Sequence, residues 1–463
     1  MQPTQKAARL ISAVSHEYRV ENMKMSFSYQ LNLFDMESSL SSTNDSLNGR
    51  SGAFVDNMRL PVHRWFRYSA GFSADWVRWL VRERRGESSS FVVLDPFAGV
   101  GTTLLACDAE NIQSWGFETH PFVYRIANAK IRGIHVDLPT LNALFKRFAD
   151  SISNKSAIEL KETPALLTKC YTPETLSLLY LMRDLFLVKF DEKTPESELL
   201  WLALTAILRS CSGVGTAQWQ YVLPNKKKSS AQTPLAAFKS KAIEILRDVE
   251  YAQRNCWCSG SHVLMTDARD PKGFPYLQVD AVVTSPPYPN NYDYADATRL
   301  EMTFWREITG WGDLQDAVRK HLIRSCSQHA SAEKLVLDEL LAEPVLDPIR
   351  EDLSTACRTL AEVRETKGGR KNYHTMAAAY FRDIGLVFKS LRQLCRPGSF
   401  ACFVIGDSAP YGVYLSVDTW LGELALAAGF RSYSFEKIRD RNIKWKNRKH
   451  RVPLKEGRLW IEG

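Results

Sequence analysis

The sequence predicts an α/β protein with a Rossmann-like, mostly parallel sheet. Two stretches indicate this fold, because in each a short apolar run of the length of a buried strand leads directly into a polar loop. The first run, residues 91–94 (FVVL), is followed by DPFAGVGTT at residues 95–103 and then by the helix-like residues 104–106. The second run, residues 279–283 (VDAVV), leads into TSPPY at residues 284–288. Strands that feed loops and helices in this way are typical of ligand-binding α/β folds.

The first loop has the features of a cofactor site. Gly99 and Gly101 let the backbone turn sharply and approach a ligand without an intervening Cβ atom. A dinucleotide site of the G-x-G-x-x-G type would have a third glycine where this chain has Leu104. A phosphate loop would have a lysine after its second glycine, and none follows Gly101. The loop therefore predicts a cofactor other than a dinucleotide or ATP.

The second loop is suited to an amine. Its prolines fix φ and remove two backbone donors, which leaves carbonyls that can accept hydrogen bonds from a ligand N–H. Ser285 adds another acceptor, and Tyr288 offers a flat face for stacking a base. Methyl transfer to such an amine is mainly a matter of positioning and needs no covalent nucleophile. A polyproline-type recognition ligand is the alternative, but the buried strand that leads into the loop argues against it.

The two motifs together resemble those of the S-adenosylmethionine-dependent DNA amino-methyltransferases, D-P-F-x-G-x-G-T for the cofactor and [DNS]-P-P-[YF] for catalysis. The resemblance implies a class I methyltransferase fold, a mostly parallel seven-stranded sheet with a C-terminal antiparallel hairpin and helical insertions. It implies S-adenosyl-L-methionine as the cofactor and double-stranded DNA as the substrate. The implied catalytic residues are Ser285, Pro286, Pro287 and Tyr288.

The resemblance also implies a set of cofactor-binding residues. Those in the glycine loop are Asp95, Pro96, Phe97, Gly99, Gly101, Thr102 and Thr103. Glu118 ends the strand-like run 114–117, where an acid typically takes the ribose hydroxyls. Asp267 ends the run 263–267, a position that in the family lies near the adenine amine. Residues 61–80 resemble the family block over the methionine end of the cofactor, and there we expect contacts from Phe72 and Ser73.

The target base is predicted to be flipped into a pocket beside the methyl donor. Serine at position 285, with Thr284 before it, is commoner in the cytosine N4 enzymes than in the adenine N6 enzymes. We therefore favour cytosine N4, with adenine N6 as the alternative. Cytosine carbon-5 chemistry needs a cysteine nucleophile, usually after proline, and this chain has no Pro-Cys pair. Two further alternatives are an RNA amino-methyltransferase and a non-catalytic DNA-binding component of a defence system.

The cofactor motif precedes the catalytic motif, whereas many S-P-P-Y enzymes have the opposite order. After a polar, poorly ordered segment 1–55, we expect the methyltransferase core in three pieces, residues 56–131, 259–290 and 373–463. Two largely helical insertions, 132–258 and 291–372, separate these pieces, and either or both could recognise the DNA target. The second insertion begins beside the catalytic motif, so we expect Tyr292 to line the target pocket.

The last piece of the core ends in a basic segment. Its predicted elements are a helix at 376–394, a turn at 396–398, a strand at 399–407, a helix at 417–428, and strands at 432–438 and 458–461. In the related fold the last two strands form a hairpin beside the target pocket. A mixture of cations with one aromatic suits a phosphate backbone and a base, although a solvated basic loop is the alternative. The predicted DNA contacts are Arg441, Lys444, Trp445, Lys446, Arg448, Lys449 and Arg451.

The composition agrees with a folded enzyme. A chain of 463 residues with 45% hydrophobic residues can bury a large core, and its net charge of +8 is modest for that length. It has no run of eighteen apolar residues and no apolar signal-peptide core, so we expect a cytoplasmic protein that does not contact a membrane. Nine cysteines without paired spacing predict neither a disulfide framework nor a metal site. The resemblance suggests a cognate restriction endonuclease or a defence-system partner.

Overall fold

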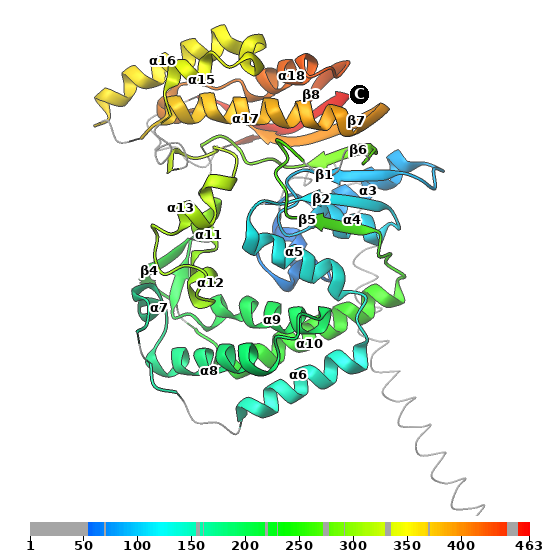
Figure 1. The fold of residues 1–463 in the computed structure, drawn as a ribbon, viewed down its shortest axis with the longest axis vertical. Helices are drawn as coiled ribbons and strands as arrows, with labels where there is room; N and C mark the ends of the chain where they lie inside the picture. Colours follow the sequence, from blue (N-terminus) through cyan, green and yellow to red (C-terminus); the bar gives the residue numbers. More distant parts are fainter. Residues whose placement is uncertain are drawn as a thin grey trace, which may run out of the picture. The chain divides into compact units, whose positions relative to one another are not determined.

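Among the described residues, seven strands form one sheet in the order β5-β2-β1-β6-β7-β9-β8 (Figure 1). Neighbouring strands are parallel except at β9, which is antiparallel to both β7 and β8. The strand bounds are Val92–Asp95 for β1, Gln113–Phe117 for β2, Ser261–Leu264 for β5, Val279–Thr284 for β6, Cys395–Gly406 for β7, Ser432–Arg441 for β8 and Leu454–Glu462 for β9. This topology confirms the predicted Rossmann-like, mostly parallel sheet with a C-terminal antiparallel hairpin.

The computed structural model describes most of the unit Gly52–Gly463. The described residues are 54–68, 71–153, 158–160, 162–217, 221–228, 230–271, 277–290, 292–328, 335–368, 371–441 and 452–463. The segment 1–55, predicted to be poorly ordered, lies almost wholly outside them. No described helix is long and apolar enough to cross a membrane.

Alternate residues of the central strands face two different layers of helices. Val93, Ala281 and Val283 pack on one face against α3 (Ala74–Arg85) and α4 (Thr102–Ala109). Leu94 and Val282 pack on the other face in a cluster with α17 (Tyr373–Leu394) and α18 (Val417–Ala427). This alternation follows from the period of two in a strand, and burial on both faces explains why the strand sequences are nearly continuous apolar runs.

Two strands differ from the sequence prediction. We expected the third parallel strand to end at Asp267, but β5 ends at Leu264 and Asp267 lies in the turn beyond it. We also expected a turn at residues 396–398, but these residues belong to β7. The register between β6 and β7 shifts there, and Gly398 has φ +79°, a left-handed conformation that glycine adopts readily. The Arg-Pro-Gly sequence thus marks an irregularity within a strand.

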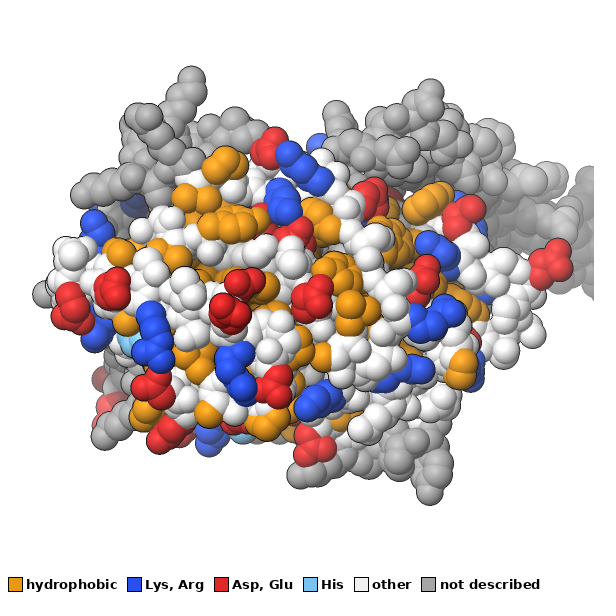
Figure 2. Space-filling view, turned by 90° about the horizontal axis from the view of Figure 1, so that it is seen from above, with side chains coloured by type: hydrophobic (Ala, Val, Ile, Leu, Met, Phe, Trp, Pro, Cys, Tyr) orange, Lys and Arg blue, Asp and Glu red, His pale blue; other side chains and the backbone are white. Residues whose placement is uncertain are grey.

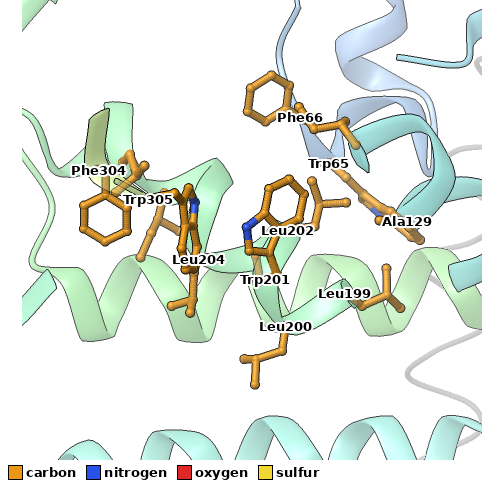
Figure 3. Close-up of a cluster of buried hydrophobic side chains, with 14 of the residues drawn as sticks. Trp65, Phe66, Ala129, Leu199, Leu200, Trp201, Leu202, Leu204, Phe304 and Trp305 are labelled. Atoms are coloured by element: carbon orange, nitrogen blue, oxygen red, sulfur yellow. The ribbon is translucent and has the colours of Figure 1, made fainter. Parts of the chain in front are cut away.

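The chain between β2 and β5 is mostly helical. Its helices are α5 (Pro121–Gly133), α6 (Leu138–Ser153), α7 (Ala165–Cys170), α8 (Pro173–Lys189), α9 (Pro195–Cys211) and α10 (Pro234–Arg254). Sequence analysis did not predict the antiparallel pair β3 (Val214–Thr216) and β4 (Val222–Lys227) in this region. Large side chains join these helices to the rest of the unit, since Trp201 of α9 lies between Trp65 and Trp305 (Figure 3).

The chain between β6 and α17 packs in two parts, the first against the helices that follow β2 and the second against the core helices α17 and α18. Its first elements are α11 (Tyr294–Ala297), α12 (Arg299–Phe304), α13 (Leu314–Ala317) and the 3-10 turn η3 (Arg319–His321). Trp305, directly after α12, packs on Trp201 and donates its indole N–H to Thr205 at 2.9 Å. These contacts attach the first part of the segment to the helices that follow β2.

The later elements of the same segment pack on the core helices instead. They are α15 (Leu337–Leu341), η4 (Pro344–Ile349) and α16 (Arg350–Thr366), which share the hydrophobic cluster of α17 and α18. These helices lie at the top of Figure 1. Figure 2 shows the molecule from that side, and basic and acidic side chains are interspersed on the surface that faces the viewer. A mixed surface of this kind does not favour a polyanion, so the described part of this face gives no support for DNA binding there.

A buried carboxylate attaches α10 to the segment that precedes the sheet. Asp248 is 1% exposed and accepts hydrogen bonds from the backbone N–H of Val62, the side chain of Arg64 and the indole of Trp65. All three donor residues lie more than 180 residues away in sequence. Asp248 is therefore one point at which the helical region is joined to residues 62–65.

Candidate active site

The two loops singled out in the sequence lie next to each other. The strands that precede them, β1 and β6, are parallel neighbours with Val93 opposite Ala281 and Leu94 opposite Val282. The glycine loop and residues 284–288 therefore leave the sheet at the same edge, at the carboxyl ends of adjacent strands. This edge is where open α/β sheets bind their ligands.

Asp95 joins the two loops. Its Oδ1 accepts hydrogen bonds from the backbone N–H of Phe97 at 3.0 Å and from the hydroxyl of Thr284 at 2.6 Å. Its Oδ2 accepts from the hydroxyl of Thr103 at 2.7 Å. Burial raises the pKa of this carboxyl to about 6, although the three donors act in the opposite direction. Asp95 is thus turned inward, where it braces the loop against the strand that precedes the catalytic motif.

The glycine loop has the backbone conformation that its sequence predicts. Gly99 has φ +54° and Gly101 has φ +87°, and Gly101 is the N-cap of α4. Pro96 is buried, Phe97 is half-buried, and Thr102 and Thr103 are buried in the first turn of α4. A Cβ atom at Gly99 would lie 3.9 Å from the ring of Tyr68. Tyr68 was not predicted from the sequence, because its position beside the loop depends on the fold of residues 54–68 rather than on a local pattern.

Glu118 lies directly after β2 and contacts the same loop. Its Oε2 accepts the backbone N–H of Gly99 at 2.9 Å, and its Oε1 accepts that of His120 at 2.7 Å. Burial raises its pKa to about 7. The ring of His120 is also buried and bonds Thr298 at 2.9 Å, which connects this corner to the segment after the catalytic motif. Glu118 retains lone pairs that can accept further donors, as ribose hydroxyls require.

The catalytic motif lies between β7 and the end of β8. The hydroxyl of Ser285 donates to the carbonyl oxygen of Val404 at 3.3 Å. Pro286 is buried, while Ser285, Pro287 and Tyr288 are half-buried. Burial raises the pKa of Tyr288, so its phenol is neutral at physiological pH. The guanidinium of Arg441 lies over the Tyr288 ring, 5.2 Å from its centre.

Further tyrosines surround this motif. The rings of Tyr292 and Tyr294 meet edge to face with centroids 5.4 Å apart. The hydroxyl of Tyr221, directly before β4, accepts the backbone N–H of Asp293 at 2.7 Å. Burial raises the pKa of Tyr68 and of Tyr294 well above the ordinary value, and Tyr292 acts on both in the same direction. The structure thus brings Tyr292 near Tyr288 of the catalytic motif, together with Tyr294 of the same segment and with Tyr68 and Tyr221 from two others.

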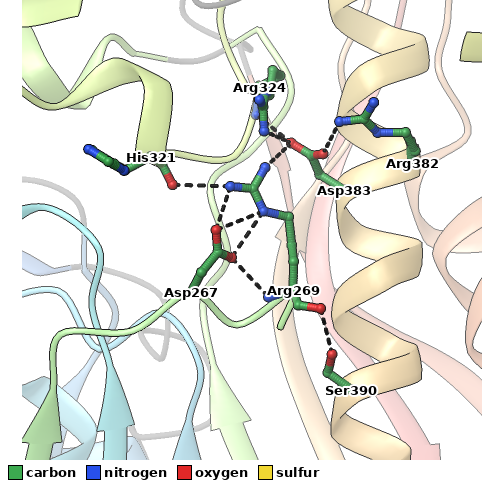
Figure 4. A network of polar contacts seen from close by, with 7 residues as sticks. All are labelled: Asp267, Arg269, His321, Arg324, Arg382, Asp383 and Ser390. Atoms are coloured by element: carbon green, nitrogen blue, oxygen red, sulfur yellow. Dashed lines mark hydrogen bonds and ion pairs between the residues drawn. The ribbon is translucent and has the colours of Figure 1, made fainter. Parts of the chain in front are cut away.

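Asp267 is engaged by Arg269 (Figure 4). Both of its carboxylate oxygens accept from the guanidinium, and its Oδ1 also accepts the backbone N–H of Arg269. The same arginine pairs with the fully buried Asp383 of α17 at 3.0 Å. Met265, 61% exposed, follows β5 at the position where we expected the acid-bearing strand to continue. A role for Asp267 toward the adenine amine stays a prediction.

Phe72 and Ser73 have structural partners. The Phe72 side chain is 4% exposed and packs in the cluster of α3 and the sheet. Ser73 is the N-cap of α3 and accepts the backbone N–H of Trp76 at 3.3 Å. These contacts neither support nor contradict a role at the methionine end of a cofactor, so that role also stays a prediction.

Most of the predicted DNA contacts of the basic segment fall outside the described residues. They are Lys444, Trp445, Lys446, Arg448, Lys449 and Arg451. Arg441 is described, and its guanidinium faces the catalytic motif. Among the described residues, no group of three or more His, Cys, Asp or Glu side chains could hold a metal ion.

The chain is similar to Type II methyltransferases. It is 28% identical over 423 residues to Type II methyltransferase M.AvaI of Nostoc sp., which covers 85% of this chain and 83% of that protein. M.AvaI of Anabaena variabilis gives the same values. Type II methyltransferase M.BsoBI of Geobacillus stearothermophilus is 25% identical over 448 residues, 86% of this chain and 84% of that protein. This similarity supports a methyltransferase and leaves open which base is modified.

Comparison with protein-family models and with solved structures does not narrow the function further. No protein-family model matches the chain. The solved structure of the rRNA methyltransferase aviRa from Streptomyces viridochromogenes covers 87% of this chain and 85% of its own, at 7% identity and a TM-score of 0.31. The fold assignment therefore depends on the strand order described above.

Glu118 should make stability depend on pH. Its pKa is raised from 4.5 to about 7 in the folded chain, so between these values the unfolded state has lost a proton that the folded state keeps. Stability from this group therefore falls as pH rises from 4.5 to 7 and is level above that range. Glu118→Gln cannot ionise, so the free energy of unfolding of the variant relative to wild type should rise over the same range. Urea unfolding at pH 5 and pH 8 measures this difference; a difference that is equal at both pH values would contradict the burial of Glu118.

Proposed function

We propose that the chain transfers a methyl group from S-adenosyl-L-methionine to the exocyclic amine of a base flipped out of double-stranded DNA. Cytosine N4 is the favoured target and adenine N6 is the alternative. The observation that carries this proposal is the junction of the two loops, in which Thr284 donates to Asp95 at 2.6 Å and thereby fixes residues 285–288 beside the glycine loop. Similarity to Type II methyltransferases over most of the chain supports it.

The loop and its neighbours fit the cofactor. Two glycines with positive φ leave the backbone open to close approach, and Glu118 brings acceptor oxygens to the same corner for two ribose hydroxyls. Tyr68 supplies an aromatic surface next to Gly99. When bound, S-adenosylmethionine supplies an electrophilic methyl group on a sulfonium. The chain's own contribution is to hold the acceptor amine in line with that methyl group.

The catalytic motif can orient the amine through its acceptors. Because the Ser285 hydroxyl donates a hydrogen bond to the carbonyl oxygen of Val404, its own oxygen can accept one from an N–H of the base. The carbonyl of Pro286 is a second acceptor, and Tyr288 stacks on the base. Two accepted hydrogen bonds direct the nitrogen lone pair toward the methyl group. The proton released after transfer passes to solvent.

The choice of cytosine and the assignment of a partner are supported by fewer observations than the methyl transfer itself. Ser285 after Thr284 favours cytosine N4, as argued from the motif. The names of the relatives, Type II methyltransferases, make a cognate restriction endonuclease the partner we propose. Recognition of the DNA sequence by the helical regions on either side of the catalytic motif is part of the same proposal.

The function is tested by single-molecule sequencing of DNA from cells that express the chain, scored for N4-methylcytosine and N6-methyladenine. We expect N4-methylcytosine at one short sequence in the wild type and its loss in Ser285→Ala. The control is Ser354→Ala, which changes a half-buried serine on α16, far along the chain from both motifs.

Each outcome has a distinct meaning. N6-methyladenine in place of N4-methylcytosine would support the enzyme class and overturn the preferred base. An unchanged mark in Ser285→Ala would show that the assigned pocket is wrong. Absence of any mark in the wild type would contradict the proposed DNA substrate, and RNA from the same cells would then be examined for methylated amines.

A further inference from the structure

Arg441 ends β8 and turns toward the catalytic motif. Its Nη1 donates to the carbonyl oxygen of Asp407 at 2.8 Å, and its Nε lies 3.8 Å from a carboxylate oxygen of Glu456. The guanidinium carbon lies 5.2 Å from the centre of the Tyr288 ring. Only 21% of the side chain is exposed. The sequence alone placed Arg441 in a basic run directed at DNA phosphates, whereas here its charge is committed to groups of the protein.

Gly406 makes this close approach possible. It is the last residue of β7, and a Cβ atom there would lie 2.6 Å from Nη1 of Arg441 and 3.0 Å from Cε2 of Tyr288. The first of these distances is shorter than a Cβ contact tolerates, so a side chain at position 406 would displace the arginine, the ring or both. Three strands thus converge on one contact, because β6 leads into Tyr288, β7 ends at Gly406 and leads into Asp407, and β8 supplies Arg441.

We propose that Arg441 is a positioning residue that holds the ring of Tyr288 from one side, so that the other face receives the target base. This inference rests on the proposed function. A guanidinium is attracted to the electron-rich face of an aromatic ring, and the bond to Asp407 fixes where that charge lies. The orientation of the Tyr288 ring is then set before the base arrives. Less conformational freedom of the ring therefore has to be lost when the base is positioned for transfer.

This role and a phosphate contact differ in their salt dependence. An arginine that neutralises a DNA phosphate contributes about 0.9 to the slope of the logarithm of affinity against the logarithm of salt concentration. An arginine that positions Tyr288 contributes nothing to that slope and acts on the rate of the bound complex. Kinetics and salt titration together therefore separate the two.

The first test compares Arg441→Met with Arg439→Gln. Arg439 is a matched control, since it lies two residues earlier on β8, is half exposed and pairs with the same Glu456 at 2.8 Å. We expect Arg441→Met to lower kcat about tenfold, the order expected for a partly buried cation–π contact, and to leave the salt slope of DNA binding unchanged. Arg439→Gln should keep kcat. In a Tyr288→Ala background, Arg441→Met should have no further effect.

A salt slope reduced by about one with kcat unchanged would overturn the proposal in favour of a phosphate contact. Independent, multiplicative effects of Arg441→Met and Tyr288→Ala would also overturn it. If Arg441→Met does not fold, Gly406→Ala is measured instead, because it displaces the same contact and leaves the charge in place. It should give the same loss of kcat without a change in salt slope.

A second measurement does not depend on activity. In protein labelled with fluorotyrosine, the fluorine resonance of Tyr288 is identified by its absence in Tyr288→Phe. This resonance should move in Arg441→Met and stay in place in Arg439→Gln. An active wild type whose Tyr288 resonance is the same in Arg441→Met would overturn the positioning role alone. A wild type that transfers no methyl group would overturn the proposed function and the positioning role of Arg441 with it.

Discussion

Replacing Asp95 by alanine is expected to lower the free energy of unfolding by about 3–5 kcal/mol and to abolish methyl transfer. The substitution leaves the Thr284 hydroxyl and the Phe97 N–H without their buried acceptor. Thr103 loses less, because its hydroxyl also lies 3.2 Å from the carbonyl oxygen of Val283. Hydrogen bonds to a charged group contribute about 1.5–3 kcal/mol each, which sets the expected size. Urea unfolding with an unchanged m-value measures the loss.

Asp95→Asn provides the control for this experiment. An asparagine can keep its oxygen on Phe97 and Thr284 and donate from its amide to Thr103, whose proton then turns to Val283. All three contacts persist in rearranged form, so the loss of stability should be less than half of that in Asp95→Ala. Thr284→Val removes only the bond between the two loops and should separate loss of activity from loss of stability. A destabilisation below about 1 kcal/mol in Asp95→Ala would show that the brace is unimportant.

Replacing Asp248 by alanine should be comparably severe, at about 3–5 kcal/mol, through a different mechanism. The carboxylate is the common acceptor for Val62, Arg64 and Trp65, so its removal leaves a partly buried guanidinium and two buried N–H groups without a partner. We expect the helical region to separate from residues 62–65 before the sheet unfolds. Urea unfolding followed by tryptophan fluorescence should then show a lower midpoint.

The matched control lies on the same helix. Arg254 pairs with Glu250 one turn earlier, and its side chain is 63% exposed. Arg254→Ala should change stability by less than about 0.5 kcal/mol, because exposed pairs of this kind contribute little. Equal losses of unfolding free energy in Asp248→Ala and Arg254→Ala would mean that burial of the Asp248 carboxylate does not increase its contribution to stability.

The parallel part of the sheet was predictable because each strand is a short apolar run with a polar loop after it. The run 91–94 corresponds to β1, Val92–Asp95, and the run 279–283 to β6, Val279–Thr284. The glycine conformations were predictable for the same reason, since a tight turn between strand and helix demands them. These features are local, so a single sequence contains them.

The partners of Asp267 and Arg441 were not predictable in this way. Arg269 is only two residues from Asp267, but its orientation depends on Asp383, which is 114 residues further along the chain. Arg441 belongs to a basic run, and only the meeting of three strands at Gly406 turns it inward. At such positions the direction of a side chain depends on residues that are distant in the sequence, and a local sequence pattern does not identify them.

The position of β9 between β7 and β8 has a consequence for biosynthesis. β8 is translated before β9, yet it reaches the sheet through β9, so its backbone groups must wait for residues 454–462 before they can pair. Arg441 is held at the end of β8, and its contact with Tyr288 depends on that late insertion. A nascent chain could therefore complete its cofactor corner, formed by β1 and β2, well before its catalytic corner. In such a chain, the proposed binding of a methyl donor would precede the proposed ability to use it.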